Sequence, residues 1–165
     1  MSFANDRSQT FRVLHESGCF VMPNPWDVGT ARVLAQIGFP AIATTSSGLA
    51  WSLGRRDNGV SVEETLHHLR TIAQSVDVPV NADFENGFAI MPADVASNVT
   101  PAVTPGAPGL SIEDSTGDES NPLFEFTLAV DRIRAARRAI DDSGTGVLLT
   151  GRSEGFIVGR PDLAE

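Results

Sequence analysis

Acidic side chains follow two apolar segments of the chain. Asp83 and Glu85 come after the apolar residues 78–80, and their spacing of two points both side chains the same way in an extended segment. Glu113 follows a second apolar run at 109–112. Carboxylates without histidine or cysteine beside them are hard oxygen ligands, which suit Mg²⁺ or Mn²⁺ better than zinc. The alternative is that these acids cap helices or face water, but their grouping favours a metal site.

Two other groups could bind an anion. Arg152 follows the apolar residues 147–149 and could pair bidentately with a substrate carboxylate or phosphonate, or form a structural ion pair with Glu154 or Asp114. The turn at 46–48 offers backbone N–H groups to an anion, although its glycine could serve conformation alone. The residue types leave both pairs of alternatives open.

The elements that must position these groups alternate along the chain. We expect short strands at 20–22, 40–43, 78–80, 109–112 and 147–149, and helices at 29–37, 61–75, 92–100 and 122–141. Alternating strands and helices predict a parallel α/β fold. In such folds the active groups lie at the carboxyl ends of the strands, which is where the acids and Arg152 occur.

Local signals refine the helices. Ser61 and Glu64 form a capping box, and Gly144 suits the position just past a helix end. Pro101 should end the third helix near Thr100. The apolar stripe of the last helix predicts that Arg132, Arg134 and Arg138 point mostly outward.

Composition excludes several function classes. The 165 residues carry a formal net charge of -9, which argues against a nucleic-acid partner or an anionic membrane surface. Every basic residue is arginine, so lysine Schiff bases, lysine-anchored pyridoxal phosphate and the P-loop lysine are excluded within this sequence. A carbanion stabilised here must rely on a metal, arginine or backbone dipoles.

The remaining compositional features point to an ordinary cytoplasmic protein. The single cysteine, Cys19, cannot form an intrachain disulfide and is expected to be buried and inert. No apolar run is long enough to span a membrane, and the first residues lack a signal-peptide core.

Four segments in this order carry a resemblance to a known family. The chain resembles the isocitrate lyase / phosphoenolpyruvate mutase superfamily, and the resemblance extends from Phe11 to Glu165. The segments are residues 44–48 with 53–57, 83–88, 111–114 and 150–156. The resemblance implies a (β/α)8 barrel and a Mg²⁺-dependent enzyme. It implies a lyase or mutase that cleaves or forms a C–C or P–C bond beside a 2-oxo carboxylate, through an enolate-type species bound to Mg²⁺.

The resemblance also implies roles for individual residues. Asp83 resembles the direct metal ligand, and Glu85 and Glu113 resemble companions that act through metal-bound water. Asp57 and Arg152 resemble catalytic groups, an aspartate near metal and substrate and an arginine that stabilises the oxyanion. The remaining implied residues would bind the substrate, the first three through their backbone: Ser47, Gly48, Leu49 and Asn121.

The segment after Glu113 departs from the better-known subgroups. Residues 115–121 hold no cysteine, histidine or basic residue, so the cysteine-dependent lyase chemistry of isocitrate and methylisocitrate lyases is not expected. Asn121 lies at a spacing compatible with phosphonopyruvate-processing members, but their lysines are missing. The expectation is a carboxyvinyl-carboxyphosphonate phosphorylmutase-like enzyme, or a lyase or decarboxylase acting on a small 2-oxo or 2-hydroxy acid or phosphonate.

The length is short for the implied barrel, which typically needs about 250 residues. We therefore expect residues 1–165 to be one domain holding the first five βα units, with residues 161–165 starting the next helix. The chain would then be a fragment or a truncated product of an enzyme that resembles dimeric or tetrameric relatives. One alternative is a non-catalytic remnant that pairs its open edge with another chain. Another is a five-stranded doubly wound domain of flavodoxin type.

Overall fold

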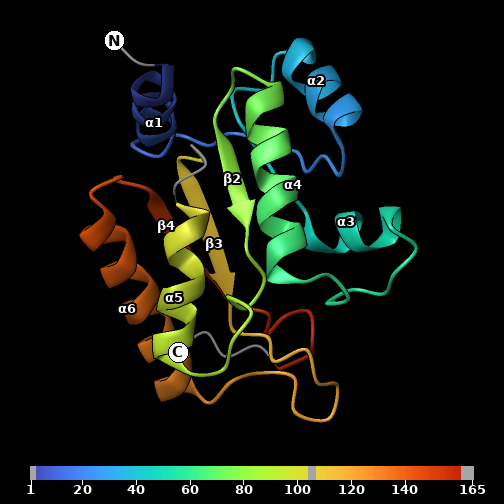
Figure 1. Cartoon of the computed structure of the whole chain (residues 1–165), viewed down its shortest axis with the longest axis vertical. Helices are drawn as coiled ribbons and strands as arrows, with labels where there is room; N and C mark the ends of the chain where they lie inside the picture. Colours follow the sequence, from blue (N-terminus) through green and yellow to red (C-terminus); the bar gives the residue numbers. More distant parts are fainter. Residues whose placement is uncertain (1–2, 104–106, 161–165) are drawn as a thin grey trace.

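The computed structural model describes residues 3–103 and 107–160 of the chain (Figure 1). Helices and strands alternate through most of this length, as the apolar pattern predicts. The elements in chain order are α1 (Phe3–Leu14), α2 (Val28–Ile37), β1 (Ile42–Ala43), α3 (Ser46–Ser52), α4 (Val62–Ser75), β2 (Val80–Asp83), α5 (Pro92–Ala102), β3 (Gly109–Glu113), α6 (Phe126–Ser143) and β4 (Leu148–Arg152). The helix start expected at 161–165 lies outside the described residues.

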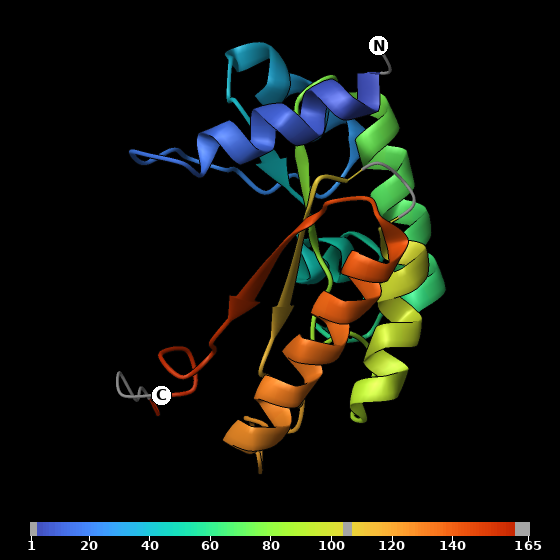
Figure 2. The ribbon, with the colours of Figure 1, turned by 90° about the vertical axis from the view of Figure 1, so that its left-hand side faces the viewer.

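The strands form one parallel sheet in the order β1-β2-β3-β4. Each strand pairs with the next in sequence, and α4, α5 and α6 lie on the same side of the sheet (Figure 2). A doubly wound sheet reverses its strand order and carries helices on both faces. The flavodoxin-type alternative is therefore wrong, and the consecutive order is that of a barrel wall.

The expected first strand at 20–22 is not a strand in the structure, which has four strands in its described part. The chain nevertheless meets the sheet just beyond it, because the Ala43 N–H donates to the Pro23 carbonyl at 3.0 Å. A single backbone bond does not make a ladder, so this segment stays irregular.

The core lies between the sheet and the helices on its covered face. Val80 and Ala82 of β2 and Leu110 and Ile112 of β3 are almost fully buried. They belong to one apolar cluster with Leu69, Ile72, Val95, Val99, Ala136 and Ile140 of the three covering helices. This packing fixes β2 and β3 as the rigid centre from which the polar loops project.

Helix α1 covers the amino ends of the strands, opposite the polar loops (Figures 1 and 2). Its Phe11 is buried against Gly109, where an added Cβ would lie 2.4 Å from the Phe11 ring. Arg7 donates to the carbonyl of Ala73 at 2.7 Å, at the end of α4. These contacts leave the carboxyl ends of the strands free for chemistry.

Several helix boundaries differ from expectation. The capping box of Ser61 and Glu64 is confirmed, and Gly144 ends α6 with a left-handed φ of 65°. Helix α5 continues through Pro101 to Ala102, because burial of Ala102 and Val103 in the core holds its last turn. Helix α6 begins at Phe126 rather than near 122. Glu125 caps this start, since its carboxylate accepts the Leu128 N–H at 3.1 Å.

Two side-chain expectations are wrong. Arg132 is buried with 1% of its surface exposed, whereas Arg134 and Arg138 are exposed as expected. Cys19 is exposed rather than buried. Within residues 3–103 and 107–160, every helix is too short or too polar to cross a bilayer.

Candidate active site

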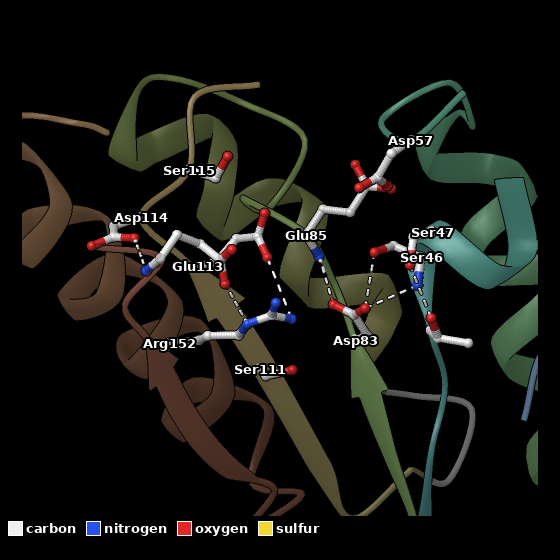
Figure 3. A network of polar contacts seen from close by, with 12 residues as sticks. Ser46, Ser47, Asp57, Asp83, Glu85, Ser111, Glu113, Asp114, Ser115 and Arg152 are labelled. Atoms are coloured by element: carbon white, nitrogen blue, oxygen red, sulfur yellow. Dashed lines mark hydrogen bonds and ion pairs between the residues drawn. The ribbon is translucent and has the colours of Figure 1, made fainter. Parts of the chain in front are cut away.

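The site lies at the carboxyl ends of β2, β3 and β4, where register brings the predicted acids together. Glu113 pairs with Arg152 across β3 and β4, and Asp83 pairs with Ser111 across β2 and β3. The strand ends therefore present Asp83, Glu113 and Arg152 side by side (Figure 3).

Asp83 is oriented by the start of α3. Its Oδ2 accepts hydrogen bonds from the backbone N–H and the hydroxyl of Ser46, both at 2.9 Å. Its own N–H donates to Thr44 Oγ1 at 2.9 Å. Helix α3 forms at this point because Thr45 caps it, its hydroxyl accepting the Gly48 N–H at 3.2 Å. Oδ2 of Asp83 is thus bound by Ser46, while Oδ1 accepts a hydrogen bond from the Glu85 N–H.

Glu85 is held in an unusual backbone conformation with its side chain buried. Its φ is 46°, in the left-handed region that non-glycine residues seldom adopt. Its Oε1 is buried and has no hydrogen-bond partner among the described residues. Burial, together with the negative charges of Asp83, Asp57 and Glu113, raises the pKa of Glu85 to about 8. Figure 3 shows the Glu85 carboxylate turned toward Asp57.

Glu113 and Arg152 form an ion-pair network. Arg152 lies 3.7 Å from Glu113 through Nη1 and 2.5 Å from Glu154 through Nε. Burial, with smaller contributions from neighbouring carboxylates, raises the pKa of Glu113 to about 7 despite the opposing charge of Arg152. Arg152 therefore takes the Glu154 pairing that the sequence left open, and its side chain remains 44% exposed and accessible to a substrate.

The carboxylates suit a metal ion by type but are not gathered around one point. Hard oxygen donors and the unpartnered Oε1 of buried Glu85 fit Mg²⁺. Across the described ranges, however, no group of three or more acidic, histidine or cysteine side chains is close enough to hold an ion. The donor set fits Mg²⁺, and its side chains would have to turn to bind it.

The predicted anion turn is occupied by helix bonds. The N–H groups of Gly48 and Leu49 donate to the Thr45 hydroxyl and carbonyl within the first turn of α3. The Ser47 hydroxyl lies 3.3 Å from Thr45 Oγ1. Helix α3 places Ser47 close to Asp83 (Figure 3), whereas the Leu49 side chain of the same helix is buried.

An open cleft of about 1320 Å³ lies beside Asp57 and Glu85. Its wall includes Asp57, Glu85, Ser115, Pro122 and Arg160. Asn121 is exposed and is not among the residues of that wall; its N–H donates to the Asp118 carbonyl at 3.1 Å within an exposed turn. The structure thus brings Asp57 and Glu85 to one cleft and leaves Asn121 at its outside.

Sequence reasoning did not predict the contacts by which three residues shape this site. Ser46 binds Asp83, and Asp114 accepts the Glu154 N–H at 2.7 Å and the Ser153 hydroxyl at 3.2 Å. Arg132 reaches the loop after β2 from α6. Ser46 and Asp114 lie inside the segments that carry the family resemblance, which was the available signal; no sequence pattern marked Arg132.

Comparison with known proteins decides the family. The model of the phosphoenolpyruvate phosphomutase family matches residues 11–165. The chain belongs to this family. The resemblance to the phosphoenolpyruvate mutase / isocitrate lyase superfamily is confirmed, and a 2,3-dimethylmalate lyase described as a member of that superfamily matches with a TM-score of 0.81 at 25% identity.

Relatives in this family include lyases and mutases. A crystal structure of a Burkholderia cenocepacia J2315 protein, provisionally named a lyase/mutase, matches with a TM-score of 0.94 and 41% identity, over 99% of this chain and 59% of that one. The 2-methylisocitrate lyase of Escherichia coli K12 is 34% identical over 119 residues, 67% of this chain and 40% of that enzyme. A phosphonopyruvate hydrolase solved with oxalate and Mg²⁺ matches with a TM-score of 0.85 at 26% identity, over 94% and 55% of the two chains.

The matches also show how much of each relative the chain covers. The chain spans about half the length of the curated relatives it matches. Its parallel α/β fold corresponds to part of their barrels, and the relatives support an enzyme of the lyase and mutase class.

Proposed function

We propose that the chain is the N-terminal part of a barrel enzyme, a Mg²⁺-dependent lyase or mutase that acts on a small 2-oxo or 2-hydroxy carboxylate or phosphonate. The observation that carries the proposal is the placement of Asp83, Glu113 and Arg152 at neighbouring strand ends, with Glu85 and Asp57 nearby. Burial first, and the neighbouring carboxylates second, raise the pKa values of Glu85 and Glu113 to about 8 and 7. Buried carboxylates with raised pKa values favour a bound cation, whose positive charge would stabilise their ionised form.

In this proposal the carboxylates bind the metal ion in two ways, directly and through water. Asp83 would hold Mg²⁺ directly, since Ser46 already orients its carboxylate, and Glu85 and Glu113 would bind through water. When bound, Mg²⁺ would supply positive charge that polarises the carbonyl of a 2-oxo acid. This agrees with a sequence that has no lysine to form a Schiff base.

Arg152 would bind the substrate's developing negative charge. Its planar guanidinium is placed by Glu154, and a carboxylate or phosphonate could share its exposed edge. Ser47 at the start of α3 would contact the other end of the substrate through its side chain, and Asp57 of the cleft wall would lie near metal and substrate.

The loop after β3 would determine the reaction subtype. Residues 115–121 carry no thiol or imidazole, so we propose chemistry without a cysteine acid, in contrast to a methylisocitrate lyase mechanism. The same loop supplies Ser115 to the cleft wall, where it would contact the substrate.

A second candidate is a non-catalytic protein that binds a partner through its open sheet edge. The exposure of Thr150, Gly151 and Arg152 on β4 favours it, as does the lack, in the described part of the chain, of a three-ligand group already gathered for a metal.

The test is Asp83→Asn in the natural full-length protein, with Asp94→Asn on the exposed first turn of α5 as the matched control. We expect Asp83→Asn to abolish Mg²⁺ binding in calorimetry and to lower Mg²⁺-dependent turnover of oxaloacetate-like and phosphonopyruvate-like substrates at least about 100-fold. Asp94→Asn should behave as wild type. Unchanged turnover in Asp83→Asn would refute the proposal, and a wild type that neither binds Mg²⁺ nor turns over substrate would favour the second candidate.

A further inference from the structure

Arg132 is a buried cation that belongs to a helix but binds a loop. It sits in the second turn of α6 with 1% of its surface exposed. Its Nη2 donates to the carbonyls of Asn86 and Ala89, the latter at 2.8 Å. Its guanidinium carbon lies 3.7 Å from the centre of the Phe124 ring. Both carbonyls belong to the loop between β2 and α5, which carries Glu85.

The charge of Arg132 has no ion-pair partner among the described residues. Burial lowers its pKa to about 10, and only the charge of Asp114 opposes that effect. Burying a cation without a carboxylate is costly, so the loop carbonyls and the aromatic face must compensate it. A neutral apolar side chain would fill the same space without that cost, which suggests that the hydrogen bonds matter.

The loop that receives these bonds is strained. Glu85 has a φ of 46° and Phe88 a φ of 56°, while Gly87 between them has a φ of 74°. Non-glycine residues in this region persist only where their surroundings over-determine them. Here the surroundings bind four consecutive carbonyls: Arg132 binds Asn86 and Ala89, and Asn98 Nδ2 binds Gly87 at 3.0 Å and Phe88 at 3.4 Å.

We infer that Arg132 is a positioning residue that clamps the 85–89 backbone in its left-handed shape and so points the Glu85 carboxylate into the acidic cleft. The clamp binds two carbonyls three residues apart, both through Nη2, while the guanidinium lies against the Phe124 ring; a lysine ammonium, which lacks the planar guanidinium, reproduces this arrangement only in part. The clamp itself is independent of the proposed function, whereas its effect on Mg²⁺ affinity rests on that function.

The test compares Arg132→Met and Arg132→Lys with Arg134→Met and Arg134→Lys in the natural full-length protein. Arg134 lies two residues away on the same helix, but it is exposed and forms an ion pair with Asp131. The readout is amide hydrogen exchange at Gly87 and Phe88, whose N–H groups donate within the loop at 2.8 and 3.0 Å. We expect exchange to be roughly tenfold faster or more in Arg132→Met, with a smaller rise in Arg132→Lys. The Arg134 variants should match wild type.

Two results would overturn the inference. One is exchange at Gly87 and Phe88 in both Arg132 variants equal to that of the Arg134 variants. The other is faster exchange by the same factor at the β2 and α5 amides, which would mark general destabilisation rather than release of the loop. If Arg132→Met does not fold, the exchange rates of Arg132→Lys, which keeps the positive charge, decide the test.

Magnesium titration gives a second readout. If the loop clamp orients Glu85, calorimetry should show roughly tenfold weaker Mg²⁺ binding in Arg132→Lys and no change in Arg134→Lys. Equal Mg²⁺ affinity in the two variants, despite a loosened loop, would remove the link to the site. A wild type that does not bind Mg²⁺ would refute the proposed function, and the exchange comparison would still decide the role of Arg132.

Discussion

Two loops border the acidic cleft, and they are built in opposite ways. The loop at 84–91, after β2, is buried or half-buried as far as Ala89 and is bound from outside itself, by Arg132 of α6 and Asn98 of α5. The loop at 114–125, after β3, is largely exposed and is bound mostly to itself. Its Thr116 hydroxyl donates to the Asn121 carbonyl at 2.5 Å, and Ser115 and Leu123 form an antiparallel bridge.

The two loops therefore suit two different roles at one site. A loop fixed by neighbouring helices can hold a carboxylate in a strained, fixed position, as catalysis by pre-placed charge requires. A loop that closes on itself can change its tip without disturbing the core, as substrate selection requires. We expect substitutions in 84–91 to cost stability and the matching ones in 114–125 to cost little.

The largest effect should come from the two left-handed glycines of these loops. Gly87→Ala and Gly117→Ala both force alanine to a φ near 75°, but only the first also places a Cβ 3.0 Å from Val95 Cγ1. We expect a loss of about 2–4 kcal/mol in the free energy of unfolding for Gly87→Ala and about 1 kcal/mol for Gly117→Ala. Urea unfolding measures both. Equal losses would contradict the division between a buried and a free loop.

A moderate effect should come from the side chains that bind loop carbonyls. Asn98→Ala removes the donor to Gly87 and Phe88, which should cost about 1–3 kcal/mol because those carbonyls are partly buried. Thr116→Val removes the bond to Asn121 at an exposed turn, where water replaces it, and should cost about 0.5 kcal/mol. Thermal unfolding of the two variants gives the comparison, and a larger loss for Thr116→Val would reverse it.

The smallest effect should be a local acid transition in the exposed loop. The hydroxyl and backbone N–H of Ser120 hold the pKa of Asp118 below its ordinary value of 3.8. A lowered folded-state pKa makes a contribution that is present above the ordinary value and lost as pH falls through the lowered one. The Ser120 amide shift should therefore titrate below pH 3.8 in NMR spectra, and Asp118→Asn should abolish that transition. An unchanged titration in Asp118→Asn would show that another group causes it.

Local signals predicted much of the fold. The capping box of Ser61 and Glu64 starts α4, and Gly144 ends α6, because each depends on neighbours within a few residues. Where the outcome depended on distant packing, prediction failed: Pro101 lies inside α5, and residues 20–22 do not form a strand. Helix α3 was expected as a loop, and it forms because Thr45 caps it beside Asp83.

The same distinction between local and distant determinants applies to the site residues. The acids and Arg152 could be predicted because parallel strands carry the residues that follow them to one edge. Their partners could not, because Ser46 meets Asp83 from 37 residues away and Arg132 meets Asn86 from 46 residues away.

The sequence by itself determined which residue types reach the cleft: carboxylates, arginine and no lysine, on a parallel α/β frame. The tertiary structure alone decided how those groups are held. The helical period predicts an outward Arg132, yet the loop carbonyls and Phe124 together make an inward pocket in which its charge is compensated. Periodicity reports only which face of a helix is apolar, whereas burial of a charge depends on what the rest of the chain places around it.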